Sequence, residues 1–276
     1  MKRPIGVIDS GVGGLTVMHE LMRQLPREKL IYLGDTKRCP YGPRSKEEVR
    51  KFTWEMVDFL LEKNIKLLVI ACNTATAFAL DDLTEKLDIP VIGVINPGSR
   101  AAIKATKNSH IGVIGTEGTI NSGAYPEALK RINPNLHITA LACPLFVPLV
   151  EKGIFSGHEV EKVVEQSLQP LKENNQMDTL ILGCTHYPLL RPVIQKVVGG
   201  SVTVISSSEE TARETSAILE IKQMQNKTDE KPVHEIYSTG EIGRFNQIAN
   251  NIFEKTIEHE FVIRPAVIDN GQFANN

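Results

Sequence analysis

Short, unbroken apolar runs alternate along this chain with longer segments in which apolar residues recur every three or four positions. The most informative run, residues 67–71, reads Leu-Leu-Val-Ile-Ala and ends abruptly at Cys72. Its length and its β-branched residues are typical of a buried strand in a parallel sheet. A helix is expected over residues 75–87, with Asn73 and Thr74 able to cap its start. Cys72 is therefore expected at the carboxyl end of a strand, where open α/β sheets bind their ligands and where a helix N-terminus favours a thiolate.

A second apolar strand ends in a thiol further along the chain. Residues 178–188 read Asp-Thr-Leu-Ile-Leu-Gly-Cys-Thr-His-Tyr-Pro, which places Cys184 112 residues after Cys72. The segment Ile-Gly-Val-Ile, which begins at Ile5, also recurs at Ile111. These repeats predict two related α/β halves, each with one thiol at a strand end. If the halves face each other, both thiols lie across one cleft.

The order of the predicted elements also gives domain boundaries. The chain is expected to cross to the second half at Asn96-Pro97-Gly98 and to return at residues 206–208. We therefore predict two pseudo-symmetric α/β domains with mainly parallel sheets and an active site in the cleft between them. The first domain is discontinuous, residues 1–96 plus 207–276, and the second is residues 97–206.

Three pairs of residues have the spacing of a capping box at a helix start. They are Ser45 with Glu48, Ser156 with Glu159, and Ser207 with Glu210. We expect a helix after each pair. The first of these helices has an apolar face made of Val49, Phe52, Met56, Val57 and Leu60.

Composition and charge exclude several classes of function. The 276 residues, 41% of them hydrophobic, can build one large core or two smaller ones. The 31 basic and 33 acidic residues leave a formal net charge of −2, which offers no electrostatic footprint for nucleic acid or an anionic membrane. No apolar stretch is long enough to span a membrane, and residues 1–9 lack the apolar core of a signal peptide. We therefore expect a soluble, cytoplasmic protein.

The cysteines are too widely spaced for a metal or disulfide framework. No Cys-x-x-Cys pair occurs among the four of them, which are Cys39, Cys72, Cys143 and Cys184. This spacing predicts neither a zinc site nor a set of structural disulfides. The two thiols at strand ends are therefore candidates for acid–base or nucleophilic chemistry.

Three titratable residues lie close to these thiols in the predicted fold. Asp9 ends the first strand, His186 lies two residues beyond Cys184, and Glu151 follows an apolar run. Taken singly, each is as readily a turn residue, a polar residue at a helix start or a solvated charge. Beside two thiols in equivalent positions, they indicate proton transfer.

A glycine-rich turn after the first strand leaves a second interpretation open. Gly11 and Gly13 have part of the spacing of a dinucleotide-binding fingerprint, and Asp35 ends the next strand. The third glycine of that fingerprint is replaced by Thr16. A nucleotide-binding dehydrogenase is therefore the alternative, although it leaves both thiols unexplained. A third possibility is a two-lobed, non-catalytic amino-acid-binding protein.

Four motifs, spread over most of the chain, support one interpretation together. Residues 9–15 read Asp-Ser-Gly-Val-Gly-Gly-Leu, residues 39–42 Cys-Pro-Tyr-Gly, residues 71–76 Ala-Cys-Asn-Thr-Ala-Thr, and residues 183–188 Gly-Cys-Thr-His-Tyr-Pro. In sequence and in order they resemble the motifs of bacterial glutamate racemases, within the aspartate/glutamate racemase superfamily. No departure occurs at these positions.

The resemblance implies a cofactor-independent racemase that interconverts L-glutamate and D-glutamate and supplies D-glutamate for peptidoglycan. It implies that Cys184 takes the proton from L-glutamate and Cys72 from D-glutamate, on opposite faces, with Asp9, Glu151 and His186 assisting. By the same resemblance, the substrate is held by Asp9, Ser10, Tyr41, Gly42, Asn73, Thr74, Thr116, Thr119, Thr185 and His186. It further implies no metal, no cofactor and a homodimer. Aspartate and hydantoins are substrates elsewhere in the superfamily, and only motif similarity separates them here.

Overall fold

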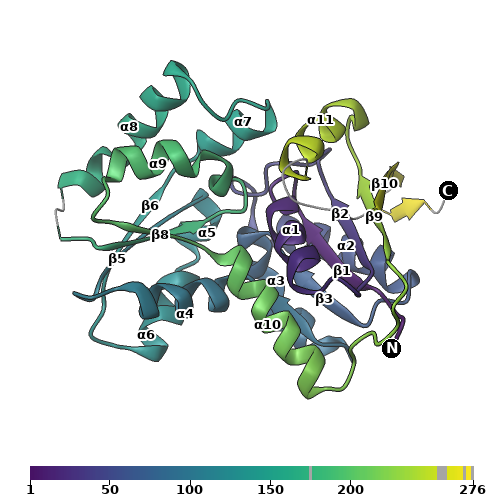
Figure 1. Ribbon diagram of the computed structural model, residues 1–276. Helices are drawn as coiled ribbons and strands as arrows, with labels where there is room; N and C mark the ends of the chain where they lie inside the picture. Colours follow the sequence, from purple (N-terminus) through teal and green to yellow (C-terminus); the bar gives the residue numbers. More distant parts are fainter. Residues whose placement is uncertain (174–175, 254–259, 270–271, 275–276) are drawn as a thin grey trace.

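Two parallel sheets form the centres of two α/β lobes in the computed structural model of the chain (Figure 1). Residues 1–173, 176–253, 260–269 and 272–274 are described. One sheet has six strands in the order β10-β9-β2-β1-β3-β4, and the other has four in the order β6-β5-β7-β8. All pairings within these two sheets are parallel, as the sequence predicts. A short antiparallel pair of strands, β11 (Val267–Asp269) and β12 (Gln272–Ala274), was not among the predicted strands.

The first lobe is built from two separate stretches of the chain. Its strands are β1 (Ile5–Asp9), β2 (Leu30–Gly34), β3 (Leu67–Ile70), β4 (Val91–Gly93), β9 (Val233–Ser238) and β10 (Glu260–Pro265). Its helices are α1 (Leu15–Gln24), α2 (Lys46–Glu62), α3 (Asn73–Lys86), α10 (Ser207–Ile221) and α11 (Ile242–Phe253). The return of the chain for β9 and β10 agrees with a discontinuous first domain, while the boundaries at 96/97 and 206/207 stay a prediction.

The second lobe is a continuous segment. Its strands are β5 (His110–Gly115), β6 (His137–Ala142), β7 (Thr179–Gly183) and β8 (Thr203–Ser206). Its helices are α4 (Ile95–Ala105), α5 (Glu117–Asn121), α6 (Ala124–Ile132), α7 (Phe146–Glu151), α8 (His158–Glu173) and α9 (Arg191–Val198), with a 3-10 turn at Tyr187–Leu190. No helix in the described part of the chain has the length and apolar character needed to cross a membrane.

Side-chain alternation in the central strand explains why helices cover both faces of the first sheet. Ile5 and Val7 of β1 pack in one apolar cluster with α1 residues such as Met18. Ile8 points to the opposite face and packs in a second cluster with residues of α2 such as Met56. Because β1 is buried on both sides, its sequence is nearly all apolar rather than alternating.

The helix starts follow the capping signals with two adjustments. The Ser45–Glu48 capping box at the start of α2 is present as predicted. At α10, Ser206 is the N-cap instead, and its hydroxyl accepts from the Ser208 backbone N–H. The predicted crossing at residues 96–98 is part of α4, because a proline in the first helical turn loses no hydrogen bond.

The two sheets repeat one topology, which confirms the sequence repeat. The order β2-β1-β3-β4 in the first sheet corresponds to β6-β5-β7-β8 in the second. Ile5 and Ile111 therefore begin equivalent central strands, and Cys72 and Cys184 follow the equivalent strands β3 and β7. In each sheet, the connection after the central strand (β1 or β5) and the connection after its neighbour (β3 or β7) lie on opposite faces of the sheet. This arrangement opens a ligand site at the carboxyl ends of the strands.

Candidate active site

Both thiols lie at the carboxyl ends of their sheets and are nearly inaccessible. Cys72 is 5% exposed and Cys184 is 6% exposed. After burial and the charge of Asp9, the charge of Cys184 also raises the pKa of the Cys72 thiol, so the two groups are close enough to interact electrostatically. The structure thus brings together the two cysteines that the sequence singles out.

Cys72 is the N-cap of α3. Its sulfur accepts the Ala75 backbone N–H at 3.5 Å and lies 3.7 Å from the Ser10 hydroxyl oxygen. These contacts favour the thiolate, as expected at a helix start. Burial outweighs them, however, and together with the charge of Asp9 it raises the pKa of Cys72 to about 12. The thiol is therefore protonated in the free protein at neutral pH, contrary to what the helix position alone suggests.

Cys184 is the first member of a chain of polar groups. Its sulfur lies 3.7 Å from Nδ1 of His186, and Nε2 of the same ring lies 2.6 Å from Oε1 of Glu151. The histidine is 2% exposed. Burial alone would lower the pKa of His186, but hydrogen bonds to Cys184, Cys39 and Glu151 raise it well above its ordinary value. An imidazolium with both N–H groups engaged therefore faces the thiol.

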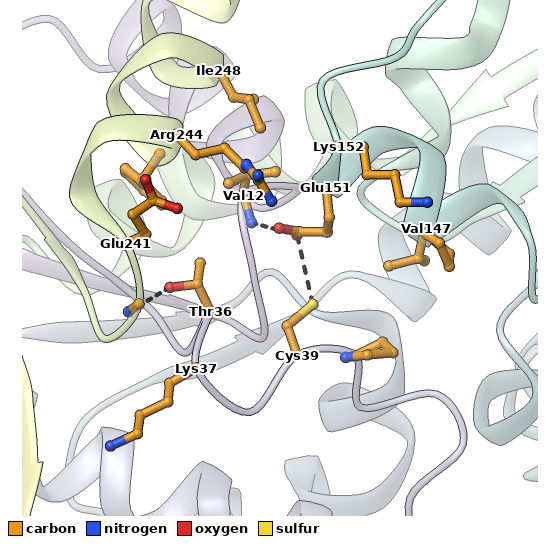
Figure 2. Close-up of a pocket in the computed structure, with 14 residues that line it drawn as sticks. Val12, Thr36, Lys37, Cys39, Val147, Glu151, Lys152, Glu241, Arg244 and Ile248 are labelled. Atoms are coloured by element: carbon orange, nitrogen blue, oxygen red, sulfur yellow. Dashed lines mark hydrogen bonds between the residues drawn. The ribbon is translucent and has the colours of Figure 1, made fainter.

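Glu151 links the second lobe to the first. Its Oε1 also accepts the backbone N–H of Val12 at 3.1 Å and lies 3.6 Å from the sulfur of Cys39 (Figure 2). Burial would raise the pKa of this carboxyl, but the hydrogen bond and charge of His186 outweigh it and hold the pKa below its ordinary value. Sequence analysis places Cys39 in a motif but assigns it no role, because its contact with Glu151 depends on the packing of the two lobes.

Asp9 forms a second link between the lobes. Its Oδ1 accepts the Gly11 backbone N–H at 2.9 Å, and its Oδ2 accepts the Thr185 hydroxyl at 3.0 Å. The side chain is fully buried, and burial raises its pKa, against the opposing effect of the His186 charge. A buried carboxylate with this fixed orientation influences Cys72 through its charge without a hydrogen bond to it.

The glycine-rich turn serves the contact between lobes. A Cβ at Gly13 would collide with the His186 ring and the Thr185 hydroxyl, and one at Gly11 would collide with Glu151. Only glycine lets the first lobe approach the second so closely. The turn is therefore explained without a dinucleotide.

Asp35, the acidic residue of the dinucleotide alternative, is already fully engaged. It is completely buried and accepts from Arg38 and from the Tyr41 hydroxyl, each at 2.5 Å. Its second oxygen accepts the Thr239 hydroxyl at 3.0 Å. Both oxygens are engaged and neither is accessible to a ribose, so the role of Asp35 is to hold the loop of residues 36–44 in place.

Hydroxyl and backbone groups from both lobes meet beside Cys72. The hydroxyl oxygens of Thr74, Thr116 and Thr119 lie 2.8–3.1 Å from one another. The Gly42 carbonyl accepts the Gly118 N–H at 2.8 Å, and a Cβ at Gly42 would collide with Thr116. These positions are those the resemblance assigns to substrate binding. Because the Tyr41 hydroxyl donates to Asp35, Tyr41 can offer a ligand only its backbone groups.

Asn73 has a buried side-chain amide in which only the oxygen makes a hydrogen bond within the described residues. Its Oδ1 accepts the Tyr125 hydroxyl at 2.8 Å, while its Nδ2 has no partner within the described residues. Tyr125 was missed in the sequence analysis, since it lies on a helix of the other lobe and belongs to no recognisable motif.

A cavity of about 480 Å³ opens beside this polar chain (Figure 2). Glu151 and Cys39 lie at its wall, and neither catalytic-candidate thiol lines it. Figure 2 shows the basic side chains of Lys37, Lys152 and Arg244 around it. Glu241 lines the same cavity beside Arg244, so the cavity gives a mixed-charge approach to Glu151, while Cys72 and Cys184 stay covered in this conformation.

Three potential metal ligands also meet here. One atom each of Cys39, Glu151 and His186 lies within 4.8 Å of the others. Within the described part of the chain, these residues form the group that could hold a metal ion. The Nε2 to Oε1 distance of 2.6 Å is that of a charge-assisted hydrogen bond. Two ligands on a tetrahedral zinc ion lie roughly 3.3 Å apart, so this conformation suits a shared proton rather than a cation.

Comparisons with known proteins agree with this geometry. The chain matches the family described as Asp/Glu/Hydantoin racemase over residues 5–215. It is 65% identical to a glutamate racemase of Oceanobacillus iheyensis, over 97% of this chain and 98% of that protein. A crystal structure of a Bacillus anthracis glutamate racemase superposes with a TM-score of 0.92 and 48% identity, covering 99% of this chain and 100% of that one. A Francisella tularensis glutamate racemase in complex with D-glutamate gives a TM-score of 0.86 and 37% identity, covering 95% and 97%. Since the family match and these full-length relatives include the segments that carry both thiols, the chain belongs to the Asp/Glu/Hydantoin racemase family.

Proposed function

We propose that this protein interconverts L-glutamate and D-glutamate without a cofactor, with Cys72 and Cys184 as bases on opposite faces of the α-carbon. The observation that carries the proposal is the placement of the two thiols. Each follows the equivalent strand of one of two sheets with the same topology, and the two interact electrostatically. The 65% identity to a glutamate racemase supports glutamate as the substrate.

A two-thiol mechanism suits this reaction because inversion requires a proton to leave one face and another to arrive on the opposite face. Either thiol can act as base or acid, so neither direction needs a group to swing around the carbon. The energetic difficulty is large: the α-proton of an amino acid is more than about 10 pKa units less acidic than a thiol, equivalent to more than about 14 kcal/mol. Preorganised donors in a water-excluded site, together with proton delivery as the bond breaks, must offset this gap.

The structure supports different environments for the two bases. Cys184 faces the charged His186, and we assign it proton removal from L-glutamate. Cys72 has a pKa raised to about 12, which suits a thiol that delivers a proton. In the reverse direction the roles exchange; the Ser10 hydroxyl lies 3.7 Å from the sulfur of Cys72, and the charge of Asp9 acts on the same thiol.

We assign substrate binding to polar groups on both lobes, most of them neutral. Candidate contacts are the side chains of Asp9, Ser10, Asn73, Thr74, Thr116, Thr119, Thr185 and His186, with backbone groups of Tyr41 and Gly42. Because both thiols are at most 6% exposed, substrate reaches them only when the lobes or their loops move apart. The basic side chains of Lys37, Lys152 and Arg244 at the cavity beside Glu151 support an approach for an acidic amino acid from that side.

The cellular setting follows from the family resemblance. We propose that the product D-glutamate is used for peptidoglycan synthesis, that the enzyme acts in the cytoplasm, and that it forms a homodimer. Analytical ultracentrifugation tests the last point, and a single monomeric species at working concentration would contradict it.

Circular dichroism of L-glutamate incubated with the purified protein, without added cofactor, tests the function directly. We expect the signal to decay to zero as the racemate forms. Cys143→Ala is the matched control, because it removes a fully buried thiol outside the proposed site and should leave the rate unchanged. An unchanging signal at high enzyme concentration sinks the proposal and favours a non-catalytic binding protein. Parallel samples with L-aspartate test the specificity, and faster decay there would overturn the choice of glutamate.

A further inference from the structure

The hydroxyl of Tyr125 reaches from the second lobe to a residue next to a proposed catalytic thiol. Tyr125 lies on α6, is 1% exposed, and donates from its hydroxyl to Oδ1 of Asn73 at 2.8 Å. Asn73 is the first residue of α3, directly after Cys72, and is 2% exposed. This hydrogen bond crosses between the lobes at the level of the site.

The bond determines which way the Asn73 amide faces. An asparagine side chain has one oxygen that accepts and one NH₂ group that donates, on opposite edges of the amide plane. With Oδ1 held by Tyr125, Nδ2 must point to the other side, where it is buried and has no partner in the described part of the chain. A buried unsatisfied donor is costly and calls for an explanation. An acceptor that arrives with the substrate provides one.

We infer that Tyr125 is a positioning residue that orients the Asn73 amide so that its NH₂ group donates to a carboxylate oxygen of the substrate. The inference rests on the proposed function and adds to it a residue outside the resembling motifs. Without the hydroxyl, the amide can rotate and present its oxygen, which repels a carboxylate. The acidic amino acid is therefore recognised by a group whose orientation is determined by the opposite lobe.

The surroundings of Tyr125 distinguish this positioning role from that of a catalytic base and from a purely structural role. Burial, with the charge of Cys184, raises the pKa of the phenol, so it stays protonated and acts as a donor rather than a base. Its ring also packs closely against Gly183, where a Cβ would lie 2.9 Å from a ring carbon. Tyr125→Phe keeps this packing and removes only the hydroxyl, so it isolates the positioning effect from the structural one.

A double-mutant cycle between Tyr125 and Asn73 tests the inference. We expect Tyr125→Phe to lower kcat/KM for glutamate about tenfold, chiefly through KM, which is the effect of losing about one oriented hydrogen bond. In the Asn73→Ala background, the same change should alter kcat/KM less than about twofold. Tyr237→Phe is the matched control: its hydroxyl donates to Glu235, away from the site, and kcat/KM should be unchanged.

A second variant keeps the test decisive if Tyr125→Phe folds poorly. Asn73→Asp retains an acceptor for the Tyr125 hydroxyl but replaces the NH₂ group by a second oxygen. We expect Asn73→Asp to bind glutamate more weakly than Asn73→Ala, seen as a higher KM and a smaller thermal shift with D-glutamate. Equal effects of Tyr125→Phe in both backgrounds, or tighter binding by the aspartate variant, would overturn the inference. If the wild-type protein fails to racemise glutamate in the same assay, the proposed function itself fails.

Discussion

Neutralising Glu151 is the sharpest perturbation of the polar chain behind Cys184. Glu151→Gln keeps the size of the side chain and can still accept from Val12, but it removes the charge 2.6 Å from Nε2 of His186. A hydrogen bond to a charged group contributes about 1.5–3 kcal/mol, equivalent to about 1–2 pKa units. Burial, which lowers the pKa of His186, is then no longer opposed by the Glu151 charge, so the pKa of His186 falls.

The kinetic consequence follows from the loss of the imidazolium beside Cys184. At slightly alkaline pH we expect kcat/KM to fall about 10- to 100-fold, and the optimum to move to lower pH, where the histidine is again protonated. The equilibrium constant of a racemisation is one, so kcat/KM must fall equally for the two enantiomers. Circular dichroism from about pH 6 to about pH 9 with each enantiomer measures both effects.

Glu241→Gln is the matched control, because Glu241 lines the same cavity (Figure 2) but makes no hydrogen bond to His186. Its pH profile should match that of the wild type. A Glu151→Gln profile that coincides with wild type, or one that is uniformly lowered without a shift in optimum, would refute this role for the carboxylate.

Three further predictions follow from other contacts. Gly13→Ala places a methyl group against His186 and should lower kcat/KM at least about 100-fold while far-UV circular dichroism is retained; near-normal activity would contradict the close approach. Lys66→Met leaves the buried carboxylate of Glu28, 2.6 Å away, without its ion-pair partner and should lower the free energy of unfolding by about 3–5 kcal/mol in urea titrations. Glu28→Leu in the same chain should restore part of this loss, and an unchanged midpoint counts against the prediction. The pH profile of wild-type kcat/KM should be bell-shaped and identical for the two enantiomers, because one thiol must be ionised and the other protonated; a profile that only rises while the protein stays folded argues against paired roles.

The raised pKa of His186 determines how its contribution to folding stability changes with pH. Its pKa is raised in the folded protein, so folding is favoured by protonation of this residue. The contribution is fully present below the ordinary pKa of about 6.5 and is lost as the pH rises through the folded value. Glu151→Gln should flatten this part of the stability profile.

Local sequence patterns predicted the strands, the two thiols at their ends and the two related sheets. Apolar strands that end in polar residues located Cys72 and Cys184, and the repeated Ile-Gly-Val-Ile segment predicted two sheets of one topology. These features succeed because strand burial and capping depend on neighbours in the chain. The motif resemblance added the remaining candidate residues.

What escaped prediction depends on groups brought together by packing. The pKa of Cys72 follows from burial and Asp9, which outweigh the local effect of the helix start. The role of Asp35 depends on its contacts with Arg38 and Thr239, the latter from a distant segment of the chain. Tyr125 carries no local signal at all, since its hydroxyl matters only where α6 meets α3.

The two thiol variants separate the faces of the α-carbon. Cys72→Ala and Cys184→Ala should each abolish racemisation, while each keeps one base. We expect Cys72→Ala to exchange the α-proton of L-glutamate only, and Cys184→Ala that of D-glutamate only. Exchange of the same enantiomer by both variants, or normal racemisation by either, would contradict the assignment.

The most direct measurement is the initial reaction of L-glutamate with the wild-type protein in D₂O, followed by proton NMR of the separated enantiomers. With two opposed bases, the D-glutamate formed carries deuterium at the α-carbon, because its new hydrogen comes from the solvent-exchanged thiol on the other face. The remaining L-glutamate keeps its proton at early times. D-glutamate that retains the original hydrogen, or L-glutamate that exchanges before it inverts, would show a single base and contradict the two-thiol mechanism.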